Sequence, residues 1–307
     1  LTNATARSSP LDPLTNNLAY RSVEALPAVS GIGTALDVSA WKFRKRVQIS
    51  RPGWQQLELD LEVLSGAEPG LRDLRLMQSG KQIPYLLEYT PIIRSLVPQV
   101  SAADDPNQPK HSRWLIKLPR SRLPVDRLVC ASSTPLFQRE FILYEPVEDA
   151  RGRQERMHLG RASWTQSPDR RTKELVLALA RAPLGDTLFL ETDNGDNPPV
   201  SLEKVQLFYP ATRVYLKAVG GEAIHIYYGN PKAELPRYDL SLVTDQLLRA
   251  EKNIVGLAAE ERLKGASWPE RFSSGGTAGI VFWGVLGLVV VVLLLVINRL
   301  LPRPPSP

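Results

Sequence analysis

The sequence predicts a mostly β protein: two tandem antiparallel β-sandwiches, a short helical neck and one C-terminal transmembrane helix. Apolar and polar residues alternate along many short segments, which is the pattern of strands that bury one face. The 26 prolines among 307 residues favour short strands and turns over long helices. An uninterrupted apolar run near the C-terminus predicts the membrane helix.

The composition narrows the classes of function. The chain is 43% hydrophobic and carries 38 Lys and Arg against 32 Asp and Glu, a net charge of +6, which is typical of a folded protein. Its single cysteine, Cys130, excludes an intrachain disulfide and a Cys-rich zinc site, and we interpret it as a small buried residue inside a strand. The sequence contains no Walker A, G-x-G-x-x-G, H-E-x-x-H or G-x-S-x-G pattern, so we predict no catalytic residue and no enzyme activity.

The N-terminal half of the chain is expected to hold a leader and the first sandwich. Residues 1–40 are rich in Ser, Thr, Asn, Ala and Pro without strong periodicity, and we expect an extended leader. The first sandwich is predicted over residues 41–150, beginning with a strand at 41–49 in which apolar and basic residues alternate. Further strands of this sandwich are predicted at residues 57–63, 73–77, 83–89, 114–118, 128–132 and 137–144.

The second sandwich is predicted over residues 151–236. We place the boundary at residues 148–154 because this stretch is charged and contains Gly152. No helical segments alternate with the strands that follow, which argues against a parallel sheet. One sandwich with a large insertion is the alternative to the tandem arrangement. The predicted strands are residues 157–164, 175–180, 187–192, 201–209, 213–217 and 223–228.

A helical neck and linker are predicted over residues 237–275. Asp239 can cap a helix, and the apolar residues after it recur at helical spacing. The neck is expected to continue through residues 257–263, and Gly275 and Gly276 belong to a flexible link. The helical apolar positions are Leu240, Val243, Leu247 and Leu248.

The apolar run extends from Ile280 to Ile297 without a charged or strongly polar side chain. At ~1.5 Å per residue such a run approaches the ~30 Å thickness of the hydrocarbon core. We therefore predict a transmembrane helix over residues 276–301, with the lipid bilayer as its partner.

The predicted orientation places residues 302–307 in the cytoplasm, because Arg299 and Arg303 follow the apolar run. The chain starts at Leu1 and not at Met, from which we expect either a mature protein whose signal peptide has been removed or a trimmed chain. The rival topology is a tail-anchored cytosolic protein, which would need an initiator Met. The prediction is a single-pass protein of the cytoplasmic membrane with its large domain outside.

The most informative polar cluster is ETDNGDNPP at residues 191–199. Carboxylate and amide oxygens at this density can hold Ca²⁺, for which Asp193 and Asp196 are the expected ligands, or the hydroxyl groups of a sugar. The alternative is a structural turn, in which Asn194-Gly195 supplies the positive φ and the side chains bond to nearby backbone. No other metal or cofactor is predicted. The candidate ligand-binding residues are Glu191, Asp193, Asn194, Asp196 and Asn197.

Two other features concern binding surfaces. The polar stretch at residues 101–111 is expected to form a loop at the end of a sandwich. Basic residues gather at 42–46 and 151–173, which indicates a solvated strand face or, as the alternative, attraction to anionic lipid headgroups. No array of stacking aromatic residues accompanies them, so no nucleic-acid partner is predicted.

Four short segments resemble a known family. DLR at residues 73–75 precedes IPY at 83–85, and YYGNP at 227–231 precedes PRYDL at 236–240. Together they resemble the motifs of a domain-of-unknown-function family of uncharacterised bacterial envelope proteins, and the likeness covers about residues 41–250. The resemblance implies secretion through a signal peptide, a β-sandwich ectodomain in the periplasm and one C-terminal membrane helix, and it implies no catalytic residue. The second sandwich is also similar, by fold analogy, to galactose-binding jelly rolls.

Three hypotheses follow for the function. The first is a membrane-anchored accessory protein of the bacterial envelope that binds a glycan or a partner protein through sandwich loops. The second is a glycan hydrolase that uses carboxylates between Glu191 and Asp196, which would need two carboxylates at a set separation. The third is a purely structural subunit of a membrane complex.

Overall fold

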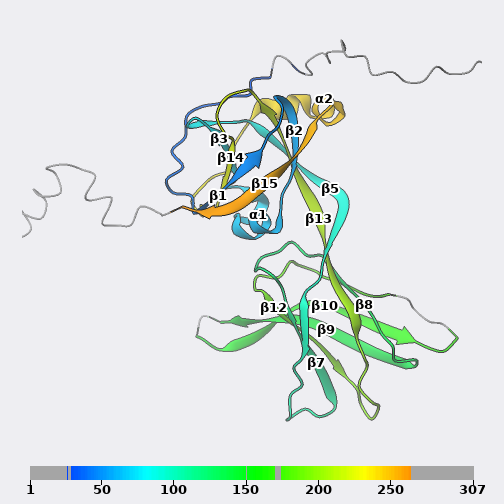
Figure 1. Cartoon of the computed structure of the whole chain (residues 1–307). Helices are drawn as coiled ribbons and strands as arrows, with labels where there is room; N and C mark the ends of the chain where they lie inside the picture. The colour runs from blue at the N-terminus through cyan, green and yellow to red at the C-terminus, as the bar shows by residue number, and fades with distance from the viewer. Residues whose placement is uncertain (1–25, 27–28, 150, 170–173, 264–307) are drawn as a thin grey trace, which may run out of the picture.

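The computed structural model describes residues 26, 29–149, 151–169 and 174–263. In this part of the chain the fold is mostly β, as predicted, and its strands form two sheets. Figure 1 shows two lobes joined by a pair of long strands, β5 (Tyr85–Leu96) and β13 (Glu203–Ala218). We call the lobe that holds both ends of the described chain the base lobe. The other lobe, formed by described residues between 93 and 210, we call the inserted lobe.

The base lobe encloses an apolar core between its sheet and the short helix α1 (Leu61–Gly66). Outward from β13, the sheet contains β2, β15, β1, β14, β3 and β4 in that order, with β15 parallel to β2. The predicted alternation places Leu57, Val214 and Ile226 inside, all fully buried. The strands are β1 (Phe43–Gln48), β2 (Gly53–Glu58), β3 (Arg75–Gln78), β4 (Lys81–Gln82), β14 (His225–Tyr228) and β15 (Asn253–Arg262).

The inserted lobe has two facing layers of strands. One layer has the order β10-β9-β12-β7-β6, and the other is formed by β11, β8 and the first half of β13. Alternate residues of both layers, among them Phe141, Leu190 and Leu207, are fully buried in one shared core. The strands are β6 (Gln99–Ala102), β7 (His111–Lys117), β8 (Arg127–Ala131), β9 (Phe137–Glu148), β10 (Gln154–Gln166), β11 (Leu175–Ala178) and β12 (Thr187–Asp193).

This arrangement differs from the predicted division into residues 41–150 and 151–236. The two sides of that boundary form one hairpin, in which β9 and β10 pair from Gln154↔Glu148 onward. The charged stretch between them is a tight turn, because the Asp149 carboxylate accepts the N–H of Arg151 and of Arg153 and Gly152 has a φ of 74°. The insertion alternative therefore describes the chain better than the tandem one.

The two predicted strands at residues 201–209 and 213–217 are a single strand, β13. Pro210 does not end it, because the residue lies at a bulge where the register between β13 and β5 shifts. The strand predicted at residues 57–63 ends early, since the Asp60 side chain accepts the N–H of Val63 and caps α1.

The predicted neck is helical only in its first part. A 3₁₀ turn, η2 (Asp239–Val243), leads into α2 (Thr244–Arg249), which packs on Trp54 and Tyr215. The rest of the described neck is β15, which lies in the sheet between β1 and β2, where its backbone groups find ladder partners on both sides. Tertiary pairing thus overrides the helix propensity of its Ala and Glu residues.

Part of the predicted leader packs on the base lobe. Gly33 donates its N–H to the Gln82 carbonyl at 2.7 Å, and Thr34 accepts the N–H of Gln82 at 2.8 Å. This pairing covers the edge of β4. The predicted membrane helix at 276–301 and the tail at 302–307 lie outside the described residues. Among the residues that are described, no helix has the length and apolarity to cross a bilayer.

Candidate functional site

The two loops that the sequence singled out meet at one edge of the inserted lobe. Asp193 pairs with His111 at the ends of β12 and β7. Beyond them, Asn194 donates its N–H to the Lys110 carbonyl at 2.8 Å, and the Lys110 ammonium lies 2.6 Å from the Asp196 carboxylate. Residues 103–111 and 193–197 therefore meet along one edge, which we call the rim.

Within the rim, residues 193–197 have the contacts of a structural turn. The Asp193 carboxylate accepts the N–H of Gly195, whose φ is 57°, and Asn197 donates to the Asn194 carbonyl. Asn194 is buried, and its amide donates to the Ser112 hydroxyl at 2.8 Å. Asp196 points into solvent, with 91% of its side chain exposed. Among the described residues, no three His, Cys, Asp or Glu side chains are grouped to hold a metal ion.

Glu191 has a different environment, on the outer face of β12. Its carboxylate accepts the Tyr144 hydroxyl at 3.1 Å and contacts the Arg156 guanidinium at 3.2 Å. That guanidinium lies over the Tyr144 ring, 4.7 Å from its centroid, and the ring stacks on Phe189 at 5.6 Å. Burial, opposed in part by Arg113, raises the pKa of the Tyr144 hydroxyl. The carboxylate and the guanidinium of this cluster can bind polar groups, but Glu191 has no second carboxylate facing it among the contacts described.

The segments that resemble the envelope family lie together in the base lobe. The Asp73 carboxylate is fully buried and accepts three backbone N–H groups, from Glu68 at 2.8 Å, from Asn230 at 2.9 Å and from Gly229. Gly229 has a φ of 88°, and a Cβ there would lie 2.8 Å from the Phe43 ring. The DLR and YYGNP segments are thus joined through one carboxylate.

Arg75 and two tyrosines extend this contact to the PRYDL segment. Arg75 donates to the Leu74 carbonyl at 2.7 Å and to the Glu234 carbonyl. The Tyr85 hydroxyl donates to the Leu74 carbonyl at 2.8 Å, and its ring meets Tyr238 edge-on at 5.2 Å. Burial raises the pKa of both tyrosine hydroxyls. These residues therefore fix the position of residues 234–240.

A groove of about 850 Å³ opens between residues 234–243 and the packed segment at residues 29–36. Its lining is more apolar than polar, and Leu235 and Leu242 beside it are 59% and 84% exposed. No sequence pattern predicts this groove, and only one of its walls, the PRYDL segment, belongs to a motif. The polar lining residues are Ser30, Thr34, Arg75, Gln82, Glu234, Arg237, Tyr238 and Asp239.

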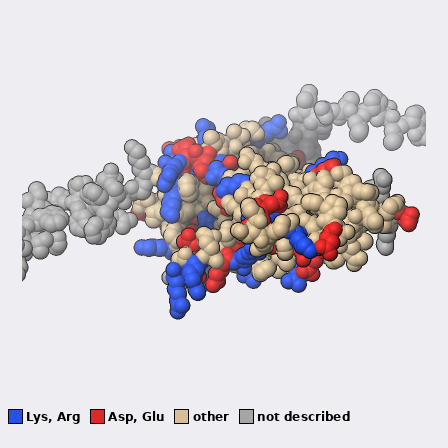
Figure 2. Space-filling model, turned by 90° about the horizontal axis from the view of Figure 1, so that it is seen from below, with Lys and Arg blue, Asp and Glu red and all other residues tan. Residues whose placement is uncertain are grey.

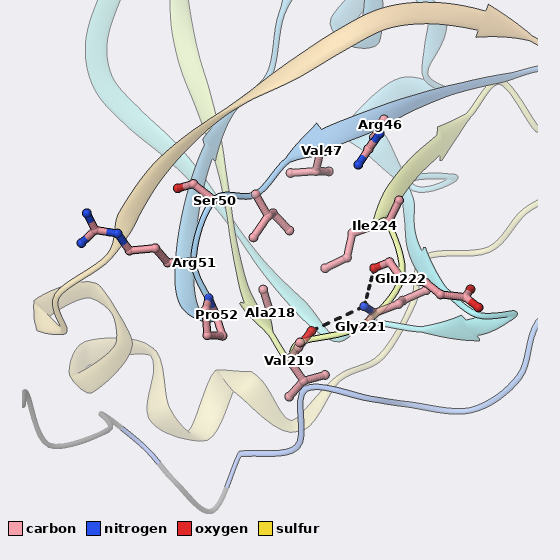
Figure 3. A pocket seen from close by; sticks show the side chains of 14 residues that line it. Arg46, Val47, Ser50, Arg51, Pro52, Ala218, Val219, Gly221, Glu222 and Ile224 are labelled. Carbon is pink, nitrogen blue, oxygen red and sulfur yellow. Dashed lines mark hydrogen bonds between the residues drawn. The ribbon is translucent and has the colours of Figure 1, made fainter.

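A smaller hollow of about 220 Å³ lies between the β1–β2 turn and the β13–β14 turn (Figure 3). The Gln78 amide closes one side by donating to the carbonyls of Glu222 at 2.6 Å and Val219 at 3.4 Å. In Figure 3 the charged ends of Arg51 and Glu222 point away from the hollow. Its size and the absence of converging charged groups among these residues make it a weaker site than the groove.

No protein-family model, curated protein or solved structure matches this chain. The choice between the groove and the rim therefore depends on their geometry.

Figure 2, seen from below, shows Lys and Arg side chains interspersed with Asp and Glu side chains. This face has no extended surface of one charge, which is what a nucleic-acid interface would need.

Proposed function

We propose that this chain is a membrane-anchored accessory protein of the bacterial cell envelope and that the groove of its base lobe holds an extended segment of a partner protein. The observation that carries the proposal is the groove itself, about 850 Å³ in volume and mostly apolar. Open apolar grooves with polar groups along their walls are typical of sites that bind peptide segments.

The exposed leucines support a partner of this kind. Leu235 and Leu242 expose most of their side chains to water, and covering a leucine side chain contributes about 1.5–3 kcal/mol. Arg237 and Asp239, at the same wall, supply charges of both signs that would fix the direction of the bound segment.

The membrane anchor is part of the proposal. It is supported by the apolar run from Ile280 to Ile297 and by the resemblance of the DLR, IPY, YYGNP and PRYDL segments to envelope proteins. In this proposal both lobes lie in the periplasm and the C-terminus lies in the cytoplasm. The partner would then be a periplasmic segment of another envelope protein.

Glycan binding on the outer face of β12, next to the rim, is the second proposal. It is favoured by the cluster of Glu191, Arg156 and Tyr144, in which charged hydrogen-bonding groups lie beside the stacked Tyr144 and Phe189 rings. Charged hydrogen-bonding groups of this type bind sugar hydroxyls, as the galactose-binding analogy also suggests. Hydrolysis would need a second carboxylate opposite Glu191.

Affinity capture from solubilised native membranes tests the first proposal. The full chain, L235D/L242D and the control variant L184D are compared by quantitative mass spectrometry. Leu184 is 62% exposed but lies in the inserted lobe, so L184D adds a charge without touching the groove. We expect one partner to be retained by the wild type and by L184D and lost from L235D/L242D. Equal recovery from all three would refute the groove as the binding site.

A further inference from the structure

The two lobes are connected by little apolar contact. Each lobe has its own core cluster, and Tyr209 on β13 packs against both. Leu61, at the start of α1, adds one contact from the base lobe to the inserted core. Domains with little apolar contact between them commonly move relative to one another unless other contacts hold them.

The ribbon of β5 and β13 is weakened where it passes between the lobes. The register shifts between Pro210 and Thr212, so that residues 90–92 of β5 lie opposite Ala211. The Thr90 hydroxyl bonds to the Ala211 carbonyl at 2.8 Å, in place of a ladder bond from the backbone. Bulges bend and twist strands, and the prolines at positions 91 and 210 remove two backbone donors.

Polar contacts bridge the lobes beside this bulge. Arg122, in the loop after β7, donates to the Ser65 carbonyl at the end of α1 at 2.9 Å, and its guanidinium lies 3.9 Å from Glu68. Arg120, in the same loop, lies 3.5 Å from Glu62 and 3.6 Å from Glu260. We call these contacts of Arg120 and Arg122 the clasp.

The clasp contacts an ionic cluster of the base lobe that includes one buried lysine. Lys45, 5% exposed, contacts Asp60 and lies 3.6 Å from Glu62. Glu260 accepts the Tyr228 hydroxyl at 2.6 Å. The carboxylates that meet Arg120 are therefore fixed in position before the inserted lobe docks, which lowers the entropy cost of the contact.

Arg122 itself has a backbone φ of 55°, a region that costs energy for a residue other than glycine. Strained backbone persists when the surrounding contacts hold it in place. In this loop the Arg122 side chain contacts α1, and the neighbouring Leu123 is fully buried in the inserted core.

We propose that the clasp is a releasable lock on lobe orientation: when it is broken, the inserted lobe turns relative to the base lobe about the bulge of β5 and β13. Because Arg120 and Arg122 are 38% and 40% exposed, salt screens their contacts. Release of the lock therefore changes the orientation of the rim relative to the groove, and this holds whatever ligand each of them binds.

Distance measurements between two spin labels test the proposal on the full chain in detergent micelles. Cysteines replace Lys81 in the base lobe and Leu136 in the inserted lobe, both of which are exposed. The native Cys130 is buried and stays unlabelled. Pulsed electron paramagnetic resonance then reports the distribution of distances between the labels.

The wild type at low salt is expected to give one narrow distance peak. The double variant R120Q/R122Q, and the wild type in about 1 M salt, where the Debye length is about 3 Å, are expected to lose that peak and give a broad distribution. R153Q, which removes an arginine paired with Asp149 inside the inserted lobe, should keep it. A peak that stays narrow in both the double variant and high salt, or a broad distribution in the wild type at low salt, would overturn the lock. The salt experiment decides the question if the double variant misfolds.

Discussion

Replacing Asp73 by Asn tests whether one buried carboxylate joins the DLR and YYGNP segments of the base lobe. The Asp73 side chain is fully buried and accepts three backbone N–H groups on its two oxygens. Asparagine keeps one of those oxygens and turns an NH₂ donor toward the remaining N–H groups. Each buried donor left without an acceptor costs about 1–3 kcal/mol. After partial relaxation we expect a loss of about 2–4 kcal/mol in the free energy of unfolding of the base lobe.

The measurement is urea unfolding of the full chain in micelles, followed by tryptophan fluorescence. With an m-value of about 2 kcal/mol/M, a loss of 3 kcal/mol moves the midpoint by about 1.5 M. Asp193→Asn is the matched control, because its exposed side chain keeps an acceptor for the Gly195 N–H, and its effect should stay within about 0.5 kcal/mol. A loss below about 1 kcal/mol in Asp73→Asn would refute the reasoning that this carboxylate joins the segments.

Three further outcomes are expected. Gly229→Ala should cost about 2 kcal/mol or more in the same urea assay, because φ is 88° and a Cβ would lie 2.8 Å from an aromatic ring. Gly80→Ala is the control, and it should cost less because Gly80 has a similar φ of 75° but no near neighbour. Equal losses would contradict the steric argument. Burial raises the pKa of the Cys130 thiol to about 12, so iodoacetamide at pH 8 should label it only after unfolding, and rapid labelling of the native protein would contradict its burial. The Arg94 guanidinium, with a smaller contribution from Arg213, lowers the pKa of the Glu58 carboxyl, so its stabilisation is present above the unfolded pKa and is lost as pH falls through the folded pKa. Because the Glu58 side chain is a third exposed, we expect Arg94→Gln to remove under ~1 kcal/mol of stability at pH 7 and less as the pH falls below the unfolded pKa of the carboxyl. A loss that grows toward acid pH would contradict this sign.

Most strands could be predicted from the sequence because alternation reports burial on one face. The alternation gave a wrong prediction where a side chain determined the backbone conformation. Asp60 is an example, because it caps a helix inside the segment predicted as a strand. The prediction also failed at residues 253–262, whose composition suits a helix but which fill a gap between β1 and β2. No local sequence pattern predicts that β15 pairs with β1 and β2, because these strands lie about 200 residues earlier in the chain.

The predicted division into two tandem sandwiches depended on how Pro210 and the charged stretch at Asp149 were interpreted. Proline was a reasonable end for a strand, and a charged stretch with glycine was a reasonable linker. Long-range pairing turned the first into a bulge and the second into a hairpin. The rim was foreseen as two loops, and their contact through Lys110 and Asp196 required the sheet register. The groove could not be foreseen, since its walls are about 200 residues apart in sequence.

Photo-crosslinking from both walls of the groove tests whether the groove holds one segment of a partner protein. A photoreactive amino acid is placed at Thr34 on one wall and at Leu242 on the other, in the full chain in its native membrane, with Leu184 as the control position. The account predicts that both groove positions capture the same peptide segment of one envelope protein and that Leu184 does not. Crosslinks that are the same at all three positions, or that differ between the two walls, would contradict a single partner segment held in the groove.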